Sequence, residues 1–192
     1  MIKRVCVYCA SSTQIAECYK KEARRLGELL AENNIHCFYG GGNVGLMGEL
    51  SRSMVSNGGL ITGIIPQFMI DEGWYNKEVE QIIVDTMHQR KGRMLEDVDA
   101  AIAMPGGCGT LEELMEAITW KQLGIFTKPI VILNINGYFD PLLTMLDKAI
   151  DEKFMRNEHR WMWSVASCAE EALTVIERMP AWGKDAIGLA AL

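Results

Sequence analysis

The stretch DAAIAMPGGCGTLEEL, residues 99–114, decides the fold. Its first half, residues 99–105, is apolar apart from one aspartate, which is typical of a strand covered on both faces of a sheet. A short glycine-rich turn follows, and apolar residues then recur with the helical period from 111 to 123. A buried strand that turns directly into a helix is the repeating half of a parallel βαβ unit.

The same alternation extends over most of the chain in both directions. Strands are predicted at residues 2–8, 36–39, 60–66, 80–85, 99–105, 129–134 and 160–165, and helices at residues 15–33, from about 45 to 57, and at 87–96, 111–123, 139–152 and 169–179. We therefore predict an α/β protein with a Rossmann-like, doubly wound parallel sheet and helices on both faces. Residues 1–180 are predicted to form a single domain, and residues 181–192 a loosely ordered tail.

Composition restricts the possible partners. A chain of 192 residues that is 49% hydrophobic can bury one substantial core, and its net charge of −6 disfavours a nucleic-acid partner. The first residues are too polar after Tyr8 for a signal peptide, and no apolar run approaches the roughly 20 residues of a membrane span, so we predict a cytoplasmic protein. The six cysteines lack metal-ligand spacing and are predicted to be free thiols, so we expect no metal, no other cofactor, and activity in the presence of a chelator.

Ligands of parallel sheets bind where strands end and helices begin, which directs attention to four turns. In the first, residues 9–13, Ser11 and Ser12 could either cap a helix or contact a phosphate. In the second, Gly40, Gly42 and Gly45 match G-x-G-x-x-G, but no acidic residue follows at the distance that a dinucleotide site requires. These glycines could line a ligand or allow tight packing of helix on strand.

The third turn leads into a helix whose first two turns carry Arg90, Lys91 and Arg93. The helix macrodipole is positive at that end, so basic residues there are unfavourable unless an anion or a carboxylate lies opposite. The alternative is a solvated face, and His88 beside them is interpreted as structural.

The fourth turn holds Gly106, Gly107 and Gly109. Thr110 and Glu113 have the spacing of a capping box, but a cap does not account for the glycines, which would let the backbone wrap an oxyanion. On the helix that follows, Glu113 lies with Ala117 and Trp120 opposite the main apolar stripe. We interpret this second face as covered by a subunit interface, which would raise the pKa of a carboxylate placed there.

Three of these turns together resemble one known family. The motifs GGGNVGLMG (40–48), MHQRK (87–91), PGGCGTLEE (105–113) and EAITWKQLGIFTKPIVILNINGYFDPLL (116–143) are similar to the Lonely Guy family of cytokinin riboside 5′-monophosphate phosphoribohydrolases. The resemblance covers about residues 3–178. Many such proteins carry an older label, lysine decarboxylase, which nothing in this sequence supports.

The resemblance implies hydrolysis of the N-glycosidic bond of N6-modified adenosine 5′-monophosphates, releasing the free base and ribose 5-phosphate. It places the catalytic pair on Arg90 and Glu113, and it implies a homodimer with active sites near the subunit interface. The implied or adjoining substrate-binding positions are Glu72, Met87, Arg90, Lys91, Gly106, Gly107, Cys108, Gly109, Thr110, Leu111, Glu112 and Thr119.

The residue types fit that chemistry. Cleavage of a ribosyl C–N bond develops positive charge at the anomeric carbon, and Glu113 is predicted to stabilise it and to take a proton from water. Arg90 stays charged at any working pH and is predicted to hold Glu113 or the ribose hydroxyls through two hydrogen bonds, with the phosphate near residues 106–110.

Two alternatives remain open at the level of sequence. One is a general AMP or purine-nucleotide nucleosidase, which would differ only around the N6 position, where Met87, Trp74 and Trp120 are candidate wall residues. The other is a non-catalytic Rossmann-like carrier of a nucleotide or of a phosphate-bearing cofactor. A carrier needs the glycine loops but not Arg90 together with Glu113.

Overall fold

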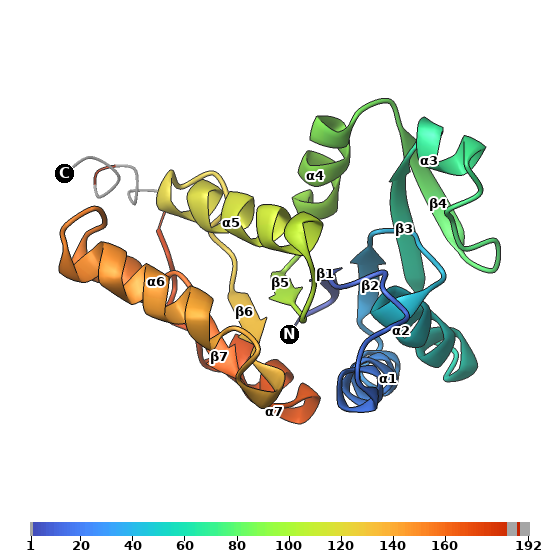
Figure 1. Cartoon of the computed structure of the whole chain (residues 1–192), viewed down its shortest axis with the longest axis horizontal. Helices are drawn as coiled ribbons and strands as arrows, with labels where there is room; N and C mark the ends of the chain where they lie inside the picture. The colour runs from blue at the N-terminus through green and yellow to red at the C-terminus, as the bar shows by residue number, and fades with distance from the viewer. Residues whose placement is uncertain (1, 184–187, 189–192) are drawn as a thin grey trace.

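The protein is built on one sheet of seven parallel strands. A computed structural model of the chain describes residues 2–183 and residue 188. In spatial order the sheet runs β4-β3-β2-β1-β5-β6-β7, with every neighbouring pair parallel (Figure 1). The strands are β1 (Arg4–Tyr8), β2 (His36–Tyr39), β3 (Ile61–Pro66), β4 (Glu80–Val84), β5 (Ala100–Ala103), β6 (Ile130–Leu133) and β7 (Ser164–Ala166).

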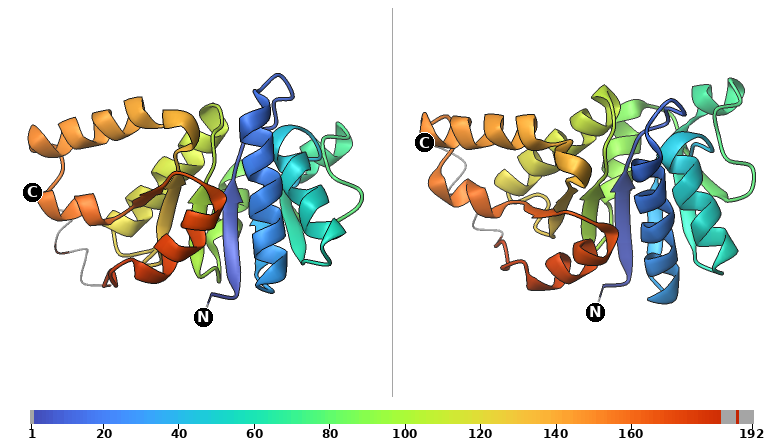
Figure 2. Two further views of the ribbon diagram at one scale, coloured as in Figure 1. Left: turned by 90° about the horizontal axis from the view of Figure 1, so that it is seen from below. Right: turned by 60° about the horizontal axis from the view of Figure 1, so that its bottom comes forward.

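Helices cover both faces of this sheet, as the two views of Figure 2 show. Helices α1, α2 and α7 share one hydrophobic core with the sheet, and α4, α5 and α6 share a second. The predicted doubly wound α/β fold is therefore confirmed. The helices are α1 (Glu17–Glu32), α2 (Gly45–Ser56), α3 (Gln67–Asp71), α4 (Met87–Leu95), α5 (Cys108–Gln122), α6 (Asp140–Asp151) and α7 (Ala169–Arg178), with short 3-10 turns η1 (Ile135–Gly137) and η2 (Asn157–Trp161). None of the described helices is long and apolar enough to cross a membrane.

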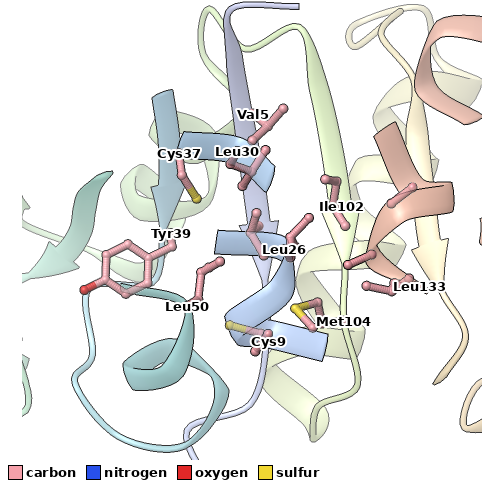
Figure 3. Packing of buried hydrophobic residues seen from close by; sticks show 14 of the residues in the cluster. Val5, Cys9, Leu26, Leu30, Cys37, Tyr39, Leu50, Ile102, Met104 and Leu133 are labelled. Carbon is pink, nitrogen blue, oxygen red and sulfur yellow. The ribbon is translucent and has the colours of Figure 1, made fainter. Parts of the chain in front are cut away.

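The core explains why the strands read as apolar runs. Figure 3 shows Leu26 and Leu30 of α1 and Leu50 of α2 lying among strand residues such as Val5 and Ile102. All five side chains are fully buried. Successive strand residues face opposite sides of the sheet, so each central strand must be apolar at every position to supply both cores.

Two predicted elements differ from the structure. The strand predicted at 160–165 begins only at Ser164, because residues 157–161 form η2, in which the Arg156 amide donates to Nδ1 of the buried His159. The helix predicted from 111 begins at Cys108, with Gly107 as its N-cap. The five-residue helix α3, which follows Pro66, has no counterpart among the predicted elements. Most of the predicted tail at 181–192 lies outside the described residues.

The strand order fixes where a ligand can bind. From β1 the chain adds β2, β3 and β4 on one side, then crosses over to place β5 on the other side of β1. The loops that follow β1 and β5 therefore leave the same edge of the sheet in opposite directions, with space between them. Open parallel sheets bind their ligands at such a switch point.

Candidate active site

A cavity of about 360 Å³ opens at the switch point between β1 and β5. One wall is the loop after β1, the other is the loop after β5 together with the first turns of α5, and Met47 of α2 closes a side. Its lining consists of Cys9, Ala10, Ser11, Ser12, Met47, Gly107, Cys108, Gly109, Thr110 and Glu113. Five of the predicted site residues, Gly107 to Thr110 and Glu113, thus share one cavity.

Glu113 is a nearly buried carboxylate that reaches this cavity. It is 8% exposed, and its Oε1 accepts a hydrogen bond of 2.5 Å from Nη1 of Arg90 on α4. Burial raises the pKa of Glu113 above the ordinary glutamate value, and the Arg90 charge opposes the rise without cancelling it. A carboxylate in this state is a better proton acceptor than an exposed one.

Arg90 is held by three groups on three segments. Its Nε donates to the Ile64 carbonyl of β3 at 2.9 Å, and its Nη2 donates to the Gly40 carbonyl at 3.4 Å. Only Nη1 is directed to Glu113, so the predicted two-bond hold on that carboxylate is wrong. The guanidinium divides its donors among backbone carbonyls because it is 7% exposed and each buried N–H needs an acceptor.

The basic residues at the start of α4 do have carboxylates opposite, as the helix dipole argument required. Lys91 is 8% exposed and its Nζ lies 2.7 Å from Glu112 and 3.4 Å from Glu116, both on α5. The hydrogen bond with Glu112 raises the pKa of Lys91 and lowers that of Glu112. Three ion pairs, one from Arg90 and two from Lys91, therefore tie α4 to α5 beside the cavity.

The loop that begins α5 is shaped by one glycine in particular. A Cβ on the buried Gly106 would lie 2.1 Å from Thr110 Oγ1, whereas nothing lies within 4 Å of a Cβ on Gly107 or Gly109. Thr110 sits inside the helix and packs against Gly106, so it is not the N-cap, and the alternative of a capping box with Glu113 does not apply. Glu113 is instead bonded to Arg90. The loop thus lies close to the helix, and residues 107–109 lie on the cavity wall.

The glycines at 40–45 serve packing around the site. A Cβ on Gly40 would meet Arg90 Nη2 at 2.5 Å, and one on Gly41 would meet Gln81 Oε1 at 2.7 Å. Gly45 has φ of +59° and touches the backbone of Ser11. None of these glycines belongs to the described cavity lining, and close packing accounts for Gly40, Gly41 and Gly45.

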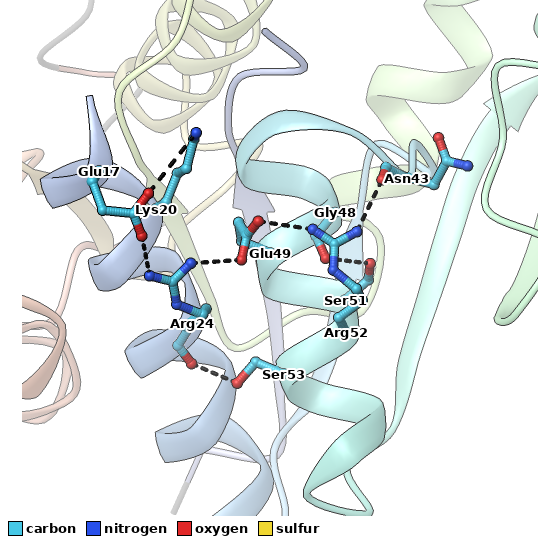
Figure 4. A network of polar contacts seen from close by, with 9 residues as sticks. All are labelled: Glu17, Lys20, Arg24, Asn43, Gly48, Glu49, Ser51, Arg52 and Ser53. Atoms are coloured by element: carbon cyan, nitrogen blue, oxygen red, sulfur yellow. Dashed lines mark hydrogen bonds and ion pairs between the residues drawn. The ribbon is translucent and has the colours of Figure 1, made fainter. Parts of the chain in front are cut away.

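A polar network outside the cavity supports the same loop (Figure 4). Glu49 of α2 bonds Arg24 of α1 and Arg52 of α2, each at 2.8 Å, and Arg52 Nη1 donates to the Asn43 carbonyl at 3.3 Å. Arg24 also pairs with Glu17. Burial acts to raise the pKa of Glu49, but the two guanidinium groups outweigh it and the net shift is downward. The network thus joins α1, α2 and the loop before α2.

The other predicted site residues do not line the cavity. Glu72 is exposed at the end of α3, Met87 is half-buried at the start of α4, and the exposed Thr119 donates to the Met115 carbonyl at 2.8 Å. Gly106 is buried behind the loop, Leu111 is half-buried, and Glu112 faces Lys91.

The burial of the Glu113 face of α5, which the sequence led us to attribute to a second subunit, is already supplied by the chain itself. Ala117 is fully buried and Glu113 is 8% exposed within the chain itself, on the same face as Leu114 and Ile118. Adjacent helical positions are only 100° apart, so one wide buried face holds Glu113 and Ala117 together with Leu114 and Ile118. Trp120 is half-buried and its ring lies 3.7 Å from where a Cβ of Gly92 on α4 would be.

Several cavity residues were not among the predicted site positions. For Ser11 and Ser12 the sequence left a capping role open, but α1 begins at Glu17 with Ala16 as N-cap, so neither serine caps it and both line the cavity. Cys9, Ala10 and Met47 carried no signal of their own. Cys9 and Ala10 line the cavity because β1 lies beside β5, and no local pattern in the sequence shows that pairing. Within the described part of the chain, no three His, Cys, Asp or Glu side chains form a group that could hold a metal.

Comparisons with known proteins agree with this geometry. The family model described as "Possible lysine decarboxylase" matches residues 47–176. The chain is 44% identical over 176 residues to cytokinin riboside 5′-monophosphate phosphoribohydrolase LOG2 of Arabidopsis thaliana, covering 91% of this chain and 83% of that protein. It is 42% identical over 188 residues to the probable enzyme LOGL5 of Oryza sativa subsp. japonica, covering 97% of this chain and 76% of that protein.

Comparison with solved structures shows that the fold is shared with other proteins. The molybdenum cofactor carrier protein from Chlamydomonas reinhardtii superposes with a TM-score of 0.70, over 93% of this chain and 98% of that chain. The two are 19% identical, so this likeness shows the fold alone. The identity and coverage of the plant relatives, together with the family model, show that the chain belongs to the Lonely Guy family, whose named members here are cytokinin riboside 5′-monophosphate phosphoribohydrolases.

Proposed function

We propose that the protein hydrolyses the N-glycosidic bond of adenosine 5′-monophosphates modified at N6, releasing the base and ribose 5-phosphate. The observation that carries this proposal is the buried Arg90–Glu113 pair, which reaches the cavity beside the glycine loop at 106–109. The curated relatives of the chain bear the name of this activity.

The reaction needs one group at the anomeric carbon. As the C1′–N9 bond breaks, its electron pair leaves with the purine and positive charge develops at C1′. Glu113 faces that charge, accepts a proton from the attacking water, and so lets the water oxygen bond to C1′. Solvent gives a proton to the departing purine and takes the one held by Glu113, which restores the carboxylate. Base catalysis of this kind contributes typically 10²–10⁴-fold. Arg90 keeps the carboxylate oriented and ionised.

The 5′-phosphate is assigned to the start of α5. Gly107, Cys108, Gly109 and Thr110 line the cavity there, and the first N–H groups of a helix have no partner within the helix. Ser11 and Ser12 add hydroxyl donors from the opposite wall. Binding energy from the phosphate positions the sugar against Glu113, so a nucleoside without phosphate should lose kcat as well as affinity.

The base extends beyond the cavity in this proposal. Glu72, Met87 and Thr119, together with Lys91 and Glu112, do not line this cavity and are assigned to the purine and its N6 substituent. Specificity for a prenylated base over plain adenine would come from this outer region. AMP is accordingly a second substrate to test.

The deciding experiment is a chromatographic assay of free base with AMP and isopentenyladenosine 5′-monophosphate compared side by side. A much higher kcat/KM for the prenylated nucleotide is the expected result. Equal rates would identify a general purine-nucleotide nucleosidase. Tight nucleotide binding without any base release would contradict the hydrolase and favour a carrier. Activity should persist in EDTA, since Glu113 acts without a metal.

We further propose that the chain works as a homodimer. Met115, Leu123 and Ile125 leave an apolar strip, 36–65% exposed, along α5 and the turn after it. Light scattering after gel filtration should give twice the 21.5 kDa chain mass, and Ile125→Glu should halve it. Leu60→Glu, at an equally exposed position outside the strip, is the control. A monomeric unmodified chain would contradict the proposal.

A cytoplasmic location also stays a proposal. It is supported by the cysteines, all six of which are free. Reducing compartments keep thiols in that form.

A further inference from the structure

The loop between β5 and α5 is fixed from behind by a tyrosine that takes no part in the scheme above. Tyr138 Oη donates a hydrogen bond of 2.7 Å to the Gly106 carbonyl. The neighbouring Pro105 carbonyl accepts from the Ala10 amide at 3.2 Å. Two consecutive peptide groups of the loop are therefore oriented by partners outside it.

The position of Tyr138 is itself tightly determined. It follows the left-handed residues Asn136 and Gly137, with φ of +53° and +70°. Its ring packs edge-on against Tyr19 and against the buried Phe139, with centroids 6.0 and 5.0 Å apart. A side chain constrained in this way can orient the group that it bonds.

The consequence follows from the geometry of the peptide bond. In a trans peptide the N–H of a residue points opposite to the C=O of the residue before it, and the described chain has no cis peptides. Tyr138 holds the Gly106 carbonyl on the side of a second, smaller cavity of about 120 Å³, which both residues line. The Gly107 N–H must point away from the Tyr138 hydroxyl, and Gly107 lines both this cavity and the main one.

We propose that Tyr138 is a positioning residue for substrate phosphate: its hydroxyl turns the 106–107 peptide so that the Gly107 N–H joins the free amides at the start of α5. The inference rests on the proposed function, since it takes the phosphate to bind at that loop. Without the hydroxyl, the peptide can rotate and the extra donor is lost, while Glu113 and Arg90 keep their own contacts.

The test compares Tyr138→Phe with Tyr19→Phe, both of which keep the edge-on ring pair. Calorimetry measures ribose 5-phosphate binding to each full chain at a temperature where both are folded. Tyr138→Phe should weaken binding about three- to tenfold, the usual effect of one hydrogen bond, and Tyr19→Phe should leave it unchanged. With the monophosphate substrate, KM should rise by the same factor and kcat should stay within about twofold.

The other outcomes separate this inference from the hydrolase. Unchanged binding in Tyr138→Phe, equal losses in both variants, or a fall in kcat without a rise in KM would each overturn it. Binding that weakens only in Tyr138→Phe, in a protein that releases no base, would support the positioning role and overturn the proposed reaction. Failure of the unmodified chain to bind ribose 5-phosphate would overturn both.

Discussion

Glu113 owes its chemical character to the interior of its own chain. Ala117 and Ile118 are buried beside it, and Arg90 comes from a neighbouring helix of the same molecule. Its raised pKa therefore needs no second subunit. Even if the site lies near a dimer interface, dissociation of the dimer should leave this property of Glu113 intact.

Replacement of Glu113 by glutamine should abolish most turnover while keeping the fold. The amide oxygen can still accept from Arg90, but it cannot take a proton from water, so kcat/KM should fall about 10²–10⁴-fold. Base release is the measurement. Glu116→Gln, on the same helix and paired with Lys91, is the control and should retain activity. Similar losses in the two variants would argue against Glu113 as the base.

The raised pKa of Glu113 should appear in the pH dependence of activity. Only the ionised carboxylate can accept a proton, so kcat/KM should rise with pH through a value above that of an ordinary glutamate. Below that value Glu113 is protonated and the rate falls tenfold per pH unit. A profile measured from pH 4 to 9 decides this, and an acid limb at or below the ordinary value would contradict it.

At the scale of the element, α5 shows how a tertiary contact overrides a local signal. Thr110 and Glu113 have capping-box spacing, yet the helix begins at Cys108 because Gly106 lets the loop pack against Thr110 and Glu113 pairs with Arg90. A partner 23 residues away is not visible in the local pattern. The glycines, by contrast, correctly indicated a loop that packs closely against a neighbouring group, which is Thr110.

Gly106→Ala should destabilise the protein through this close approach. Its Cβ would overlap Thr110, and overpacking of a filled site costs typically 1–3 kcal/mol in the free energy of unfolding. Gly107→Ala, where the space is open, should cost less than Gly106→Ala, because it loses only a favourable N-cap residue. Urea unfolding of the two variants measures the difference. Equal stability would show that the loop relaxes at no cost.

At the scale of the whole molecule, the sequence predicted the alternation of elements but not their spatial order. Both ends of strand β2 lie where the sequence predicted them. Strand β3 ends at Pro66, as predicted, because proline lacks an amide for further pairing. That β5 lies beside β1 depends on pairing between distant segments, such as Val5 with Ala100. For this reason the catalytic pair could be proposed from sequence, whereas Cys9, Ala10 and Met47 could not.

Lys121 gives the stability of the whole molecule a distinct dependence on pH. It is 1% exposed, its Nζ donates to the Lys128 carbonyl, and burial lowers its pKa to about 8, against an ordinary value of 10.5. Between these values the unfolded lysine still carries a proton that the folded one has lost, so the unfolding free energy attributable to Lys121 rises with pH there.

Comparison with Lys121→Met isolates this effect, since both proteins share every other titrating group. Between pH 8 and 10.5 the unfolding free energy of the unmodified chain should increase relative to that of the variant, by at most about 1.4 kcal/mol per pH unit. Denaturant unfolding at several pH values provides the curves. Parallel curves would mean that Lys121 keeps its proton in the folded state.

The central place of β1 in the sheet determines when during synthesis the strand can pair on both of its edges. Of the seven strands this one is synthesised first, but one of its two neighbours, β5, follows only after β2, β3 and β4 have been made. Until then one edge of β1 is open, and an open edge in a nascent chain invites pairing with other chains. Because the cavity needs both loops, substrate can stabilise only a chain that has extended past Glu113. Ligand in the cell would therefore protect the finished protein and leave the growing one dependent on chaperones.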